Sequence, residues 1–388
     1  MTPPSASCDA ESSKAKNQPM FPGRLALQQR VLPNYRLAFF DALAERCQGG
    51  LSVFAGQPRP GEVIAWGGVL KKAAHWTARN WQLLAVDSPF FQLWQGGLVR
   101  WLENWQPDAL IVEANPRYLS TPAAVEWMHA RRRPALGWGL GAPPLSGLLG
   151  RLRAAGRARF LRSLDGLIAY SQRGADEYRR LGFPSGRIFV APNATSPRPA
   201  SLPLRPATWA GKPAVLFVGR LQARKRLDLL LRACASLPAS LQPRLWIVGD
   251  GPARLELQAL ASQLYPAAEF LGARFGAELQ DVFHAADLFA LPGTGGLAVQ
   301  QALAAGLPVI VAEGDGTQDD LVRPENGWRV APGDAASLAA ALQQALADPA
   351  RLRRMGVASY QIARDEANLE NMVSVFIRAL LAITGEKS

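Results

Sequence analysis

A short apolar run followed by a helix-like segment recurs along almost the whole chain, and this alternation constrains the fold more than any other feature. In the first half the apolar runs are LALQQRV (25–31), LSVFAG (51–56), ALIVEA (109–114), PALGWGL (134–140), GLIAYS (166–171) and RIFVAP (187–192). Strands of a parallel sheet covered on both faces read as near-continuous apolar runs. The alternation of strand and helix therefore predicts an α/β fold built on parallel sheets.

A proline-rich stretch interrupts the alternation near residue 200. Five prolines fall within residues 196–213, and proline continues neither a helix nor a central strand, so we expect a linker here. The alternation restarts with AVLFVG (214–219), RLWIVG (244–249), EFLG (269–272), DLFALP (287–292), PVIVAE (308–313) and GWRVAP (327–332). The predicted fold class is therefore two Rossmann-like α/β domains, over residues 21–195 and 214–365, after a disordered polar tail over residues 1–20.

Composition narrows the classes of partner and of site. A chain of 388 residues exceeds the usual size of a single core, which agrees with two domains. The 43 basic residues outnumber 31 acidic ones, so the net charge of +12 favours anionic partners. Three cysteines and three histidines, all far apart, argue against a disulfide framework or a metal cluster and indicate a reducing compartment. No apolar run approaches the ~20 residues of a membrane span.

Two strand-to-helix turns of the second half carry glycine or cations. In AVLFVGRLQARKRLDLLLRA the strand ends at Gly219, and Arg220, Arg224, Lys225 and Arg226 precede the next helix. In LWIVGDGPARLELQ (245–258) the same order of strand, glycine turn and helix recurs around Gly249. The amides of such a turn and its cations suit a diphosphate, although either turn alone is more often a solvated connection.

A third turn is rich in glycine. Gly293, Gly295 and Gly296 follow the strand DLFALP, and a short helix, LAVQQALAAG, comes directly after them. Glycine lets a ligand approach the backbone, and the helix directs its positive end at an anion. Loops at the carboxyl ends of strands are where α/β sheets bind ligands, so the three turns together predict an anion-binding site.

Six segments in this order resemble the C-terminal domain of GT-B retaining glycosyltransferases, the large family related to sucrose synthases and bacterial mannosyltransferases. They are VGRLQARKRLDLLLRA, IVGDGPARLELQALA, EFLGA, DLFALP, QALAAGLPVIVA and ENGWRVAPGD. The likeness extends over about residues 165–365, and RVLPNYRLAFFDALAER and GWGLGAP match the N-terminal domain more loosely. It implies a GT-B fold, a nucleotide-sugar donor as substrate and no metal cofactor. It also implies that the terminal helix over residues 366–388 crosses back to the N-terminal domain.

The resemblance implies a role for individual residues. In similar enzymes an arginine and a lysine hold the donor diphosphate, which assigns catalysis to Arg220 and Lys225. Other donor-binding positions implied by the family's turns are Gly219, Gly249, Ala273, Arg274, Gly295, Gly296, Leu297, Ala298 and Gln301. The loop after the first strand faces the donor in this family, which makes Pro33, Asn34, Tyr35 and Arg36 the acceptor-side loop.

The chain departs from the family at two positions. Relatives usually carry two glutamates eight positions apart around the glycine turn, and this chain has Gly293 and Gln301 there. An amide at position 301 still donates and accepts hydrogen bonds to a ribose, whereas glycine at 293 replaces no carboxylate.

An arginine-rich tract is the last feature of note. Residues 131–163 contain eight arginines and no acidic residue, and Leu145, Leu148, Leu149 and Leu152 follow helical spacing. One interpretation is an amphipathic segment, Arg131–Arg162, that lies on an anionic membrane. The other is a solvated basic helix whose leucines face the core.

Three functions from different classes follow. The first is a glycosyltransferase of bacterial surface polysaccharide or glycolipid synthesis, cytoplasmic or peripheral on the inner membrane face, which uses a glycan or lipid-linked acceptor. The second is a non-catalytic GT-B protein that binds a nucleotide or partner, motivated by Gly293 and Gln301. The third, nucleic-acid binding, rests on net charge alone. It ranks last because the basic residues are not interleaved with stacking aromatic residues.

Overall fold

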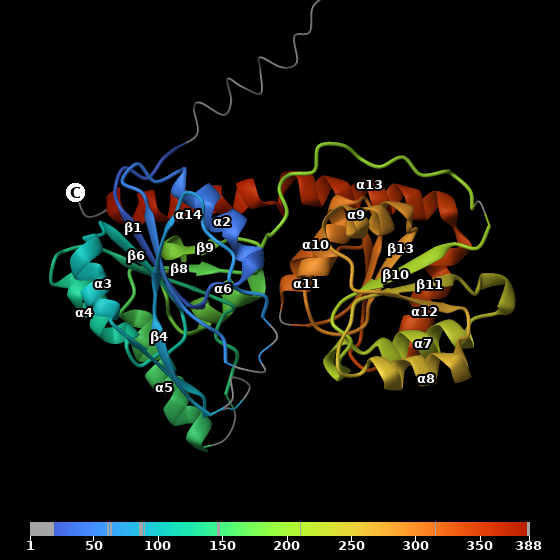
Figure 1. Cartoon of the computed structure of the whole chain (residues 1–388), viewed down its shortest axis with the longest axis horizontal. Coiled ribbons are helices and arrows are strands. Elements are labelled where there is room, and N and C mark those ends of the chain that lie inside the picture. The colour runs from blue at the N-terminus through green and yellow to red at the C-terminus, as the bar shows by residue number, and fades with distance from the viewer. Residues whose placement is uncertain are drawn as a thin grey trace, which may run out of the picture. The chain divides into compact units, whose positions relative to one another are not determined.

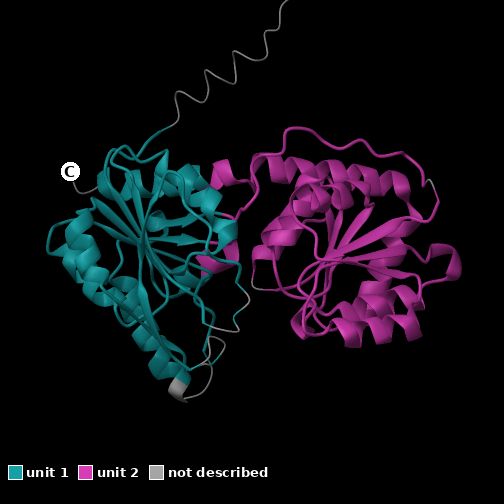
Figure 2. Cartoon of the chain, in the orientation of Figure 1, with its two compact units in different colours: residues 1–169, 177–191, 373–388 teal, residues 170–176, 192–372 magenta. Residues whose placement is uncertain are grey.

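Parallel β-sheets form the centres of two separate units in the computed structural model (Figures 1 and 2). The structure describes residues 19–59, 62, 64–84, 88, 90–145, 148–209, 211–314 and 316–385. Unit 1 comprises 1–169, 177–191 and 373–388, and unit 2 comprises 170–176 and 192–372. The predicted tail therefore lies outside the described residues except for its last two positions.

Unit 1 is built on a seven-stranded sheet in the order β3-β2-β1-β6-β7-β8-β9, all parallel. Its strands are β1 (Leu25–Val31), β2 (Leu51–Gly56), β3 (Ala74–Thr77), β6 (Ala109–Glu113), β7 (Ala135–Gly139), β8 (Gly166–Ala169) and β9 (Ile188–Val190). The central strands are buried along their length, which is why they read as apolar runs in the sequence.

Helices and a separate antiparallel hairpin complete unit 1. The helices are α2 (Leu37–Ala44), α3 (Leu98–Trp105), α4 (Thr121–His129) and α5 (Leu148–Arg162), and α6 (Gln172–Arg180) begins in unit 2 and ends in unit 1. The hairpin consists of β4 (Arg79–Leu83) and β5 (Gln92–Gly96). Sequence periodicity did not predict β3, β4 or β5.

Unit 2 repeats the design with a six-stranded parallel sheet in the order β12-β11-β10-β13-β14-β15. Its strands are β10 (Ala214–Val218), β11 (Arg244–Val248), β12 (Ala268–Gly272), β13 (Leu288–Leu291), β14 (Val309–Ala312) and β15 (Gly327–Val330). Its helices are α7 (Leu227–Ser236), α8 (Arg254–Leu264), α9 (Gly276–Ala285), α10 (Leu297–Ala304), α11 (Thr317–Leu321), α12 (Ala335–Ala347) and α13 (Pro349–Asp365). Asp334 and Asp348 cap α12 and α13 by accepting hydrogen bonds from backbone amides of the first turn.

The predicted linker, residues 196–213, forms no helix or strand where it is described, but it is part of unit 2. Arg205 anchors it by donating hydrogen bonds to the carbonyls of Phe283, Ala286 and Ala305. Burial, with Arg353 nearby, lowers the pKa of Arg205 to about 10. The division between the units therefore falls near residue 192 rather than at the prolines, and residues 170–176 also belong to unit 2.

The last helix, α14 (Leu369–Gly385), returns to unit 1 from residue 373 onward. The Phe376 ring is fully buried, with its centroid 4.9 Å from that of Phe39 and 5.0 Å from that of Trp138. Residues 349–385 include a stretch long and apolar enough to cross a membrane, contrary to the expectation from the sequence. Because 61% of that stretch is buried within the protein, its apolar residues serve core packing.

Candidate functional site

The turns after β10 and β11 approach each other so closely that only glycine fits. Gly249 has a φ of +137°, and a β-carbon at this position would overlap the carbonyl oxygen of Gly219. The Gly219 amide donates to Val248 O (3.0 Å), and the Gly249 amide donates to Gly272 O (2.8 Å). The carboxyl ends of β10, β11 and β12 therefore meet at one edge of the sheet, where ligands bind in α/β folds.

Lys225 lies among these glycines. It ends the short 3₁₀ helix η3 (Ala223–Lys225), and its stem lies in van der Waals range of a β-carbon built at Gly219. A β-carbon at Gly295 would overlap Nζ of Lys225, so the ammonium group occupies the glycine turn before α10. Lys225 therefore lies beside Gly219 and Gly295, two of the positions that the resemblance implies for the donor site.

The Lys225 ammonium group is half-buried and unpaired. It makes no hydrogen bond or ion pair with any residue that the structure describes. Burial, reinforced by the nearby Arg224, lowers the pKa of Lys225 from 10.5 to about 8. A cation that is partly desolvated and lacks a counter-charge is ready to bind an anion.

The surroundings of residue 293 explain why this position is a glycine. A β-carbon there would overlap the carbonyl oxygen of Arg224 and the backbone of Lys225, and the Thr294 amide donates to the same Arg224 oxygen (3.1 Å). The backbone of residues 224–225 thus occupies the space that a side chain at position 293 requires. Because residue 293 has no side chain, the loop that carries Lys225 can pack against the turn that precedes α10.

We expect Gly293→Ala to destabilise the protein by about 1–3 kcal/mol, the usual cost of overpacking. It should also weaken binding of nucleoside diphosphates, because the backbone that carries Lys225 must move. Gly293→Glu should be worse on both counts. Urea unfolding and diphosphate titration measure the two effects, with Gly186→Ala as control because its β-carbon meets open space. Wild-type stability and affinity in Gly293→Ala would contradict this account of the turn.

Helix α10 follows the turn, with Gly296 as its N-cap and Leu297 and Ala298 in its first turn. Gln301 is half-buried, and no side-chain hydrogen bond fixes its amide among the described residues. The neighbouring Gln300 is 3% exposed and donates from Nε2 to Asn193 O, while its Oε1 and the Oδ1 of Asn193 lack partners. No motif in the sequence points to this amide pair.

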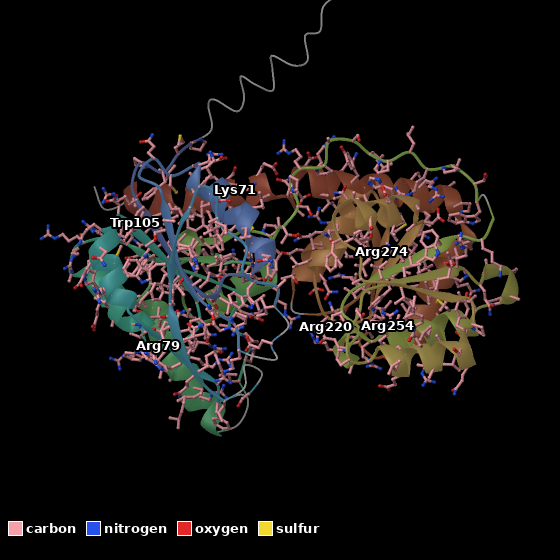
Figure 3. All side chains as sticks on the ribbon, in the orientation of Figure 1. Lys71, Arg79, Trp105, Arg220, Arg254 and Arg274 are labelled. Carbon is pink, nitrogen blue, oxygen red and sulfur yellow. The ribbon has the colours of Figure 1, made fainter. Side chains whose placement is uncertain are left out.

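The other residues predicted to bind the donor differ in the contacts they make. Arg220, labelled in Figure 3, directly follows Gly219. It makes no hydrogen bond or ion pair with a described residue. Arg274 instead bonds Leu271 O (3.1 Å) and forms an ion pair with Glu278 (3.1 Å). Ala273 follows β12, whose last residue, Gly272, contacts Gly249. The structure therefore brings Gly272 to the glycine turns and leaves the Arg274 side chain bound to α9.

The acceptor-side loop of unit 1 is held against residues 65–68. The Asn34 amide donates to Ala65 O (2.8 Å), Asn34 Oδ1 accepts from the Gly68 amide (2.9 Å), and Pro33 pairs with Trp66 in an isolated bridge. Tyr35 is 48% exposed, whereas Arg36 is buried with its guanidinium 4.5 Å above the Trp138 ring. The loop thus exposes Tyr35 to solvent, whereas Arg36 packs inside unit 1 against Trp138.

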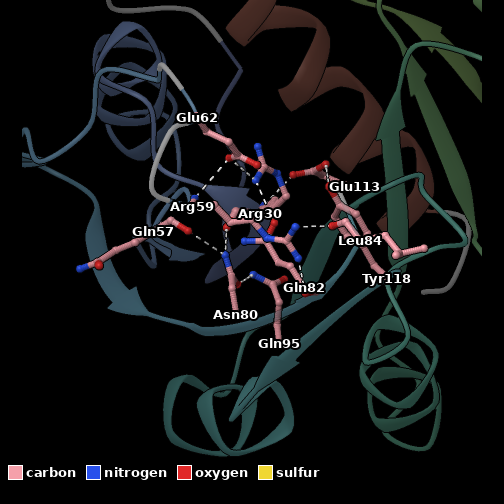
Figure 4. Close-up of polar contacts among 10 residues, drawn as sticks. All are labelled: Arg30, Gln57, Arg59, Glu62, Asn80, Gln82, Leu84, Gln95, Glu113 and Tyr118. Atoms are coloured by element: carbon pink, nitrogen blue, oxygen red, sulfur yellow. Dashed lines mark hydrogen bonds and ion pairs between the residues drawn. The ribbon is translucent and has the colours of Figure 1, made fainter. Parts of the chain in front are cut away.

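A polar cluster lies where β1 and β6 end in unit 1 (Figure 4). Glu113, at the end of β6, accepts hydrogen bonds from the Arg30 amide (2.6 Å) and the Tyr118 hydroxyl (2.7 Å). Burial raises the pKa of Glu113, while its hydrogen bonds oppose the rise. Arg30 in turn pairs with Glu62 (2.7 Å). Sequence reasoning did not single out this cluster, although a glutamate at the end of the apolar strand ALIVEA was a signal.

The predicted arginine tract, Arg131–Arg162, is not one segment, because β7 divides it: Arg131, Arg132 and Arg133 follow α4, and the other five arginines lie on α5. Arg151, Arg153, Arg159 and Arg162 of α5 are exposed, whereas Arg157 is half-buried and donates to Pro143 O (2.7 Å). Leu152 is 69% exposed, so this member of the leucine stripe does not face the core. The side chains of Leu148 and Leu149 lie outside the description.

Two family models match the two halves of the chain. Residues 41–194 match the glycosyl transferase 4-like domain, and residues 212–348 match the glycosyl transferases group 1 model. Lys225 and Gly293–Gly296 fall within the second match.

Known proteins are similar to this chain over different fractions of its length. A GDP-mannose-dependent alpha-mannosyltransferase of Mycobacterium tuberculosis is 42% identical over 125 residues, which is 31% of each chain, so the match spans under a third of that relative. The lipopolysaccharide core biosynthesis glycosyltransferase LpsE of Rhizobium meliloti is 25% identical over 74% of this chain and 90% of its own. The solved structure of Anabaena HepE in complex with UDP has a TM-score of 0.66 at 18% identity and covers 92% of this chain and 99% of its own.

Proposed function

The chain belongs to the glycosyltransferase family with the GT-B fold, and we propose that it transfers a sugar from a nucleotide-diphosphate donor to a glycan or lipid-linked acceptor. The single observation that carries the proposal is the unpaired ammonium of Lys225 within the glycine turns of unit 2. Glycine turns provide backbone amides and Lys225 provides charge, and both are what a diphosphate requires.

In the proposed reaction the bond between the sugar and the diphosphate breaks, an acceptor hydroxyl bonds to the same sugar carbon, and negative charge grows on the leaving diphosphate, which takes up the hydroxyl proton. Lys225 and Arg220 stabilise that charge, and the amides at the start of α10 add to it. Gln301 binds the donor through its neutral amide. No metal ion has a role in this proposal, because two cations neutralise the phosphates. The acceptor binds unit 1 near Tyr35, and the anomeric configuration of the donor is retained.

We expect the affinity for a nucleoside diphosphate to fall as pH rises from 7 to 9. The Lys225 ammonium, whose pKa is lowered to about 8, loses its proton over this range in the free protein. The diphosphate is already ionised there, since the second pKa of a phosphate lies near ~6. Binding must then restore the proton, so Kd should rise by up to about tenfold per pH unit above the pKa of Lys225.

Calorimetric titration at several pH values tests this expectation. Lys225→Met should bind weakly with no such pH dependence, because it has no proton to lose. A wild-type Kd that stays constant between pH 7 and 9 would show that the Lys225 charge does not contact the diphosphate.

We further propose that the protein works at the cytoplasmic face of a membrane, held there by the exposed arginines of α5. Each cation near an anionic surface contributes ~1 kcal/mol to binding. Replacing Arg151, Arg153, Arg159 and Arg162 with glutamine removes four such charges and should therefore weaken binding to phosphatidylglycerol vesicles at low salt by up to about 1000-fold. Flotation assays measure it, with neutral vesicles as control. Equal flotation of both proteins would leave α5 as a solvated helix.

The alternative function is a non-catalytic GT-B protein that binds nucleotide without transfer. The observation that favours it is the pair Gly293 and Gln301 in place of the usual glutamates. Release of nucleoside diphosphate from a nucleotide sugar separates the two, because a binding protein releases none.

A further inference from the structure

The β4–β5 hairpin of unit 1 buries amide side chains on its inner face and exposes two tryptophans on its outer face. Asn80 and Gln82 of β4 are half-buried, and Leu93 and Gln95 of β5 are buried. The exposed face carries Arg79, Trp81, Leu83, Gln92 and Trp94. Trp81 and Trp94 pair directly across the two strands, and they are 46% and 49% exposed. Antiparallel sheets with one solvated face commonly place apolar residues inside and polar residues outside, so a pair of exposed tryptophans over buried amides departs from that arrangement.

Hydrogen bonds on the inner face fix this orientation (Figure 4). Gln95 Nε2 donates to Gln29 O (3.0 Å) and Asn80 Oδ1 (2.9 Å), and Asn80 Nδ2 donates to Arg30 O (2.7 Å). Rotating either strand to bury its tryptophan would move these amides to the surface and leave backbone carbonyls of β1 unpaired. The exposure of Trp81 and Trp94 is therefore built into the fold.

The outer face of the hairpin grades from apolar to cationic along its length. Leu83, at the end of β4, lies on this face and is 61% exposed, and Leu84 and Phe90 outside the strands are 56% and 60% exposed. The tryptophan pair lies in the middle. At the other end the Arg79 guanidinium lies 4.9 Å above the Trp81 ring. Proteins that dip into a bilayer arrange side chains in this order, with aliphatic groups deepest, tryptophan at the interface and arginine among the headgroups.

The charge around the face favours an anionic partner. From residue 64 to residue 96 the sequence has three cations, Lys71, Lys72 and Arg79, and one acidic residue, Asp87. A second copy of this chain would present the same cations and be repelled, since the net charge is +12. A glycan would stack on the tryptophans but would gain nothing from Leu83, Leu84 and Phe90.

We propose that the outer face of the β4–β5 hairpin inserts into the interface of an anionic bilayer and anchors unit 1 there. The anchor is distinct from the electrostatic attraction of α5. Apolar insertion is insensitive to salt, whereas attraction between charges is screened. Stable peripheral attachment takes two such signals together, one apolar and one basic.

The test uses the full-length protein and vesicles of phosphatidylcholine with or without phosphatidylglycerol, in flotation assays at 0.1 M and ~0.5 M salt. At high salt, the double variant Trp81→Ser/Leu83→Ser should bind vesicles about tenfold or more weakly than wild type does. The matched control is Leu255→Ser/Phe275→Ser in unit 2, whose side chains are 82% and 78% exposed, and it should bind as wild type does. Trp81→Phe keeps an apolar ring and should retain binding, and far-UV circular dichroism verifies that each variant is folded.

Several results would overturn the proposal. Wild-type protein that fails to float, or a hairpin variant that floats as wild type does, excludes a bilayer anchor. Binding to heparin oligosaccharide that the hairpin variant loses, without vesicle binding, would identify a glycan as the occupant. Self-association lost only in the hairpin variant would identify a second copy. The assay contains no donor, so its outcome is independent of whether the protein transfers sugar.

Discussion

Replacing Lys225 with alanine is expected to lower turnover about 100-fold or more, the cost of removing one donor that stabilises charge in a transition state. The diphosphate gains charge as it leaves, so a cation held beside it stabilises the transition state more than the ground state. The Lys225 ammonium is suited to this role, because it is half-buried in the glycine turns and has no partner among the described residues. Steady-state kinetics with the identified donor measure the loss in kcat.

Two comparisons make this result specific. Gln301→Ala should mainly raise KM, since a hydrogen bond to the donor is present in ground and transition states alike. The free energy of unfolding of Lys225→Ala should stay close to that of wild type, because removing an unpaired side chain breaks no hydrogen bond. Wild-type kcat in Lys225→Ala would show that the diphosphate binds elsewhere.

Phe376→Ala is expected to destabilise the protein by about 3–5 kcal/mol, the usual cost of truncating a buried phenylalanine. Phe376 is fully buried and lies edge-on to the rings of Phe39 and Trp138. Its truncation removes the centre of the packing that joins the last helix to α2 and β7. Chemical denaturation followed by circular dichroism measures the loss.

The matched control for this prediction is Val357→Ala on α13, whose side chain is 41% exposed. An exposed substitution of this kind should change stability by less than about 0.5 kcal/mol. Phe376→Leu should recover part of the loss, because it refills most of the volume. If Phe376→Ala unfolds at the same denaturant concentration as wild type, the end of α14 contributes nothing to the fold of unit 1.

The central strands could be predicted from the sequence because both of their faces are buried. Val215, Leu216 and Phe217 of β10 illustrate this, since all three are fully buried. The polar residues Gln28, Gln29 and Arg30 in β1 did not obscure that strand, although they too are buried. The short LALQQRV run still carried enough apolar residues at its start.

The β4–β5 hairpin could not be predicted from the sequence for a physical reason. It buries amides and exposes tryptophans, and the carbonyls that its amides bond, those of Arg30 and Gln29, lie 50 and 66 residues away in the chain. Local periodicity cannot distinguish such a strand from a loop, because the pattern makes sense only when the partner strand is known. The role of Glu113 could not be predicted for the same reason, since its partners Tyr118 and Arg30 come together with it only in the folded chain.

The candidate site in unit 2 was largely predictable because glycines and cations mark it in the sequence. What the sequence could not provide was the reason for Gly293. Only the folded chain shows that the backbone of residues 224–225 fills the space at that position. The absence of a glutamate there is thus part of how Lys225 is held in place.

The central claim is that the protein transfers sugar from a nucleotide donor, and the most direct test is release of nucleoside diphosphate. Wild type and Lys225→Ala are incubated with UDP-, GDP-, ADP- and dTDP-sugars and a membrane glycolipid extract as acceptor, and the freed diphosphate is quantified by mass spectrometry. We predict that wild type consumes at least one donor and that the variant does so about 100-fold more slowly. A donor that raises the melting temperature of wild type without any release of diphosphate would contradict the claim and identify a nucleotide-binding protein.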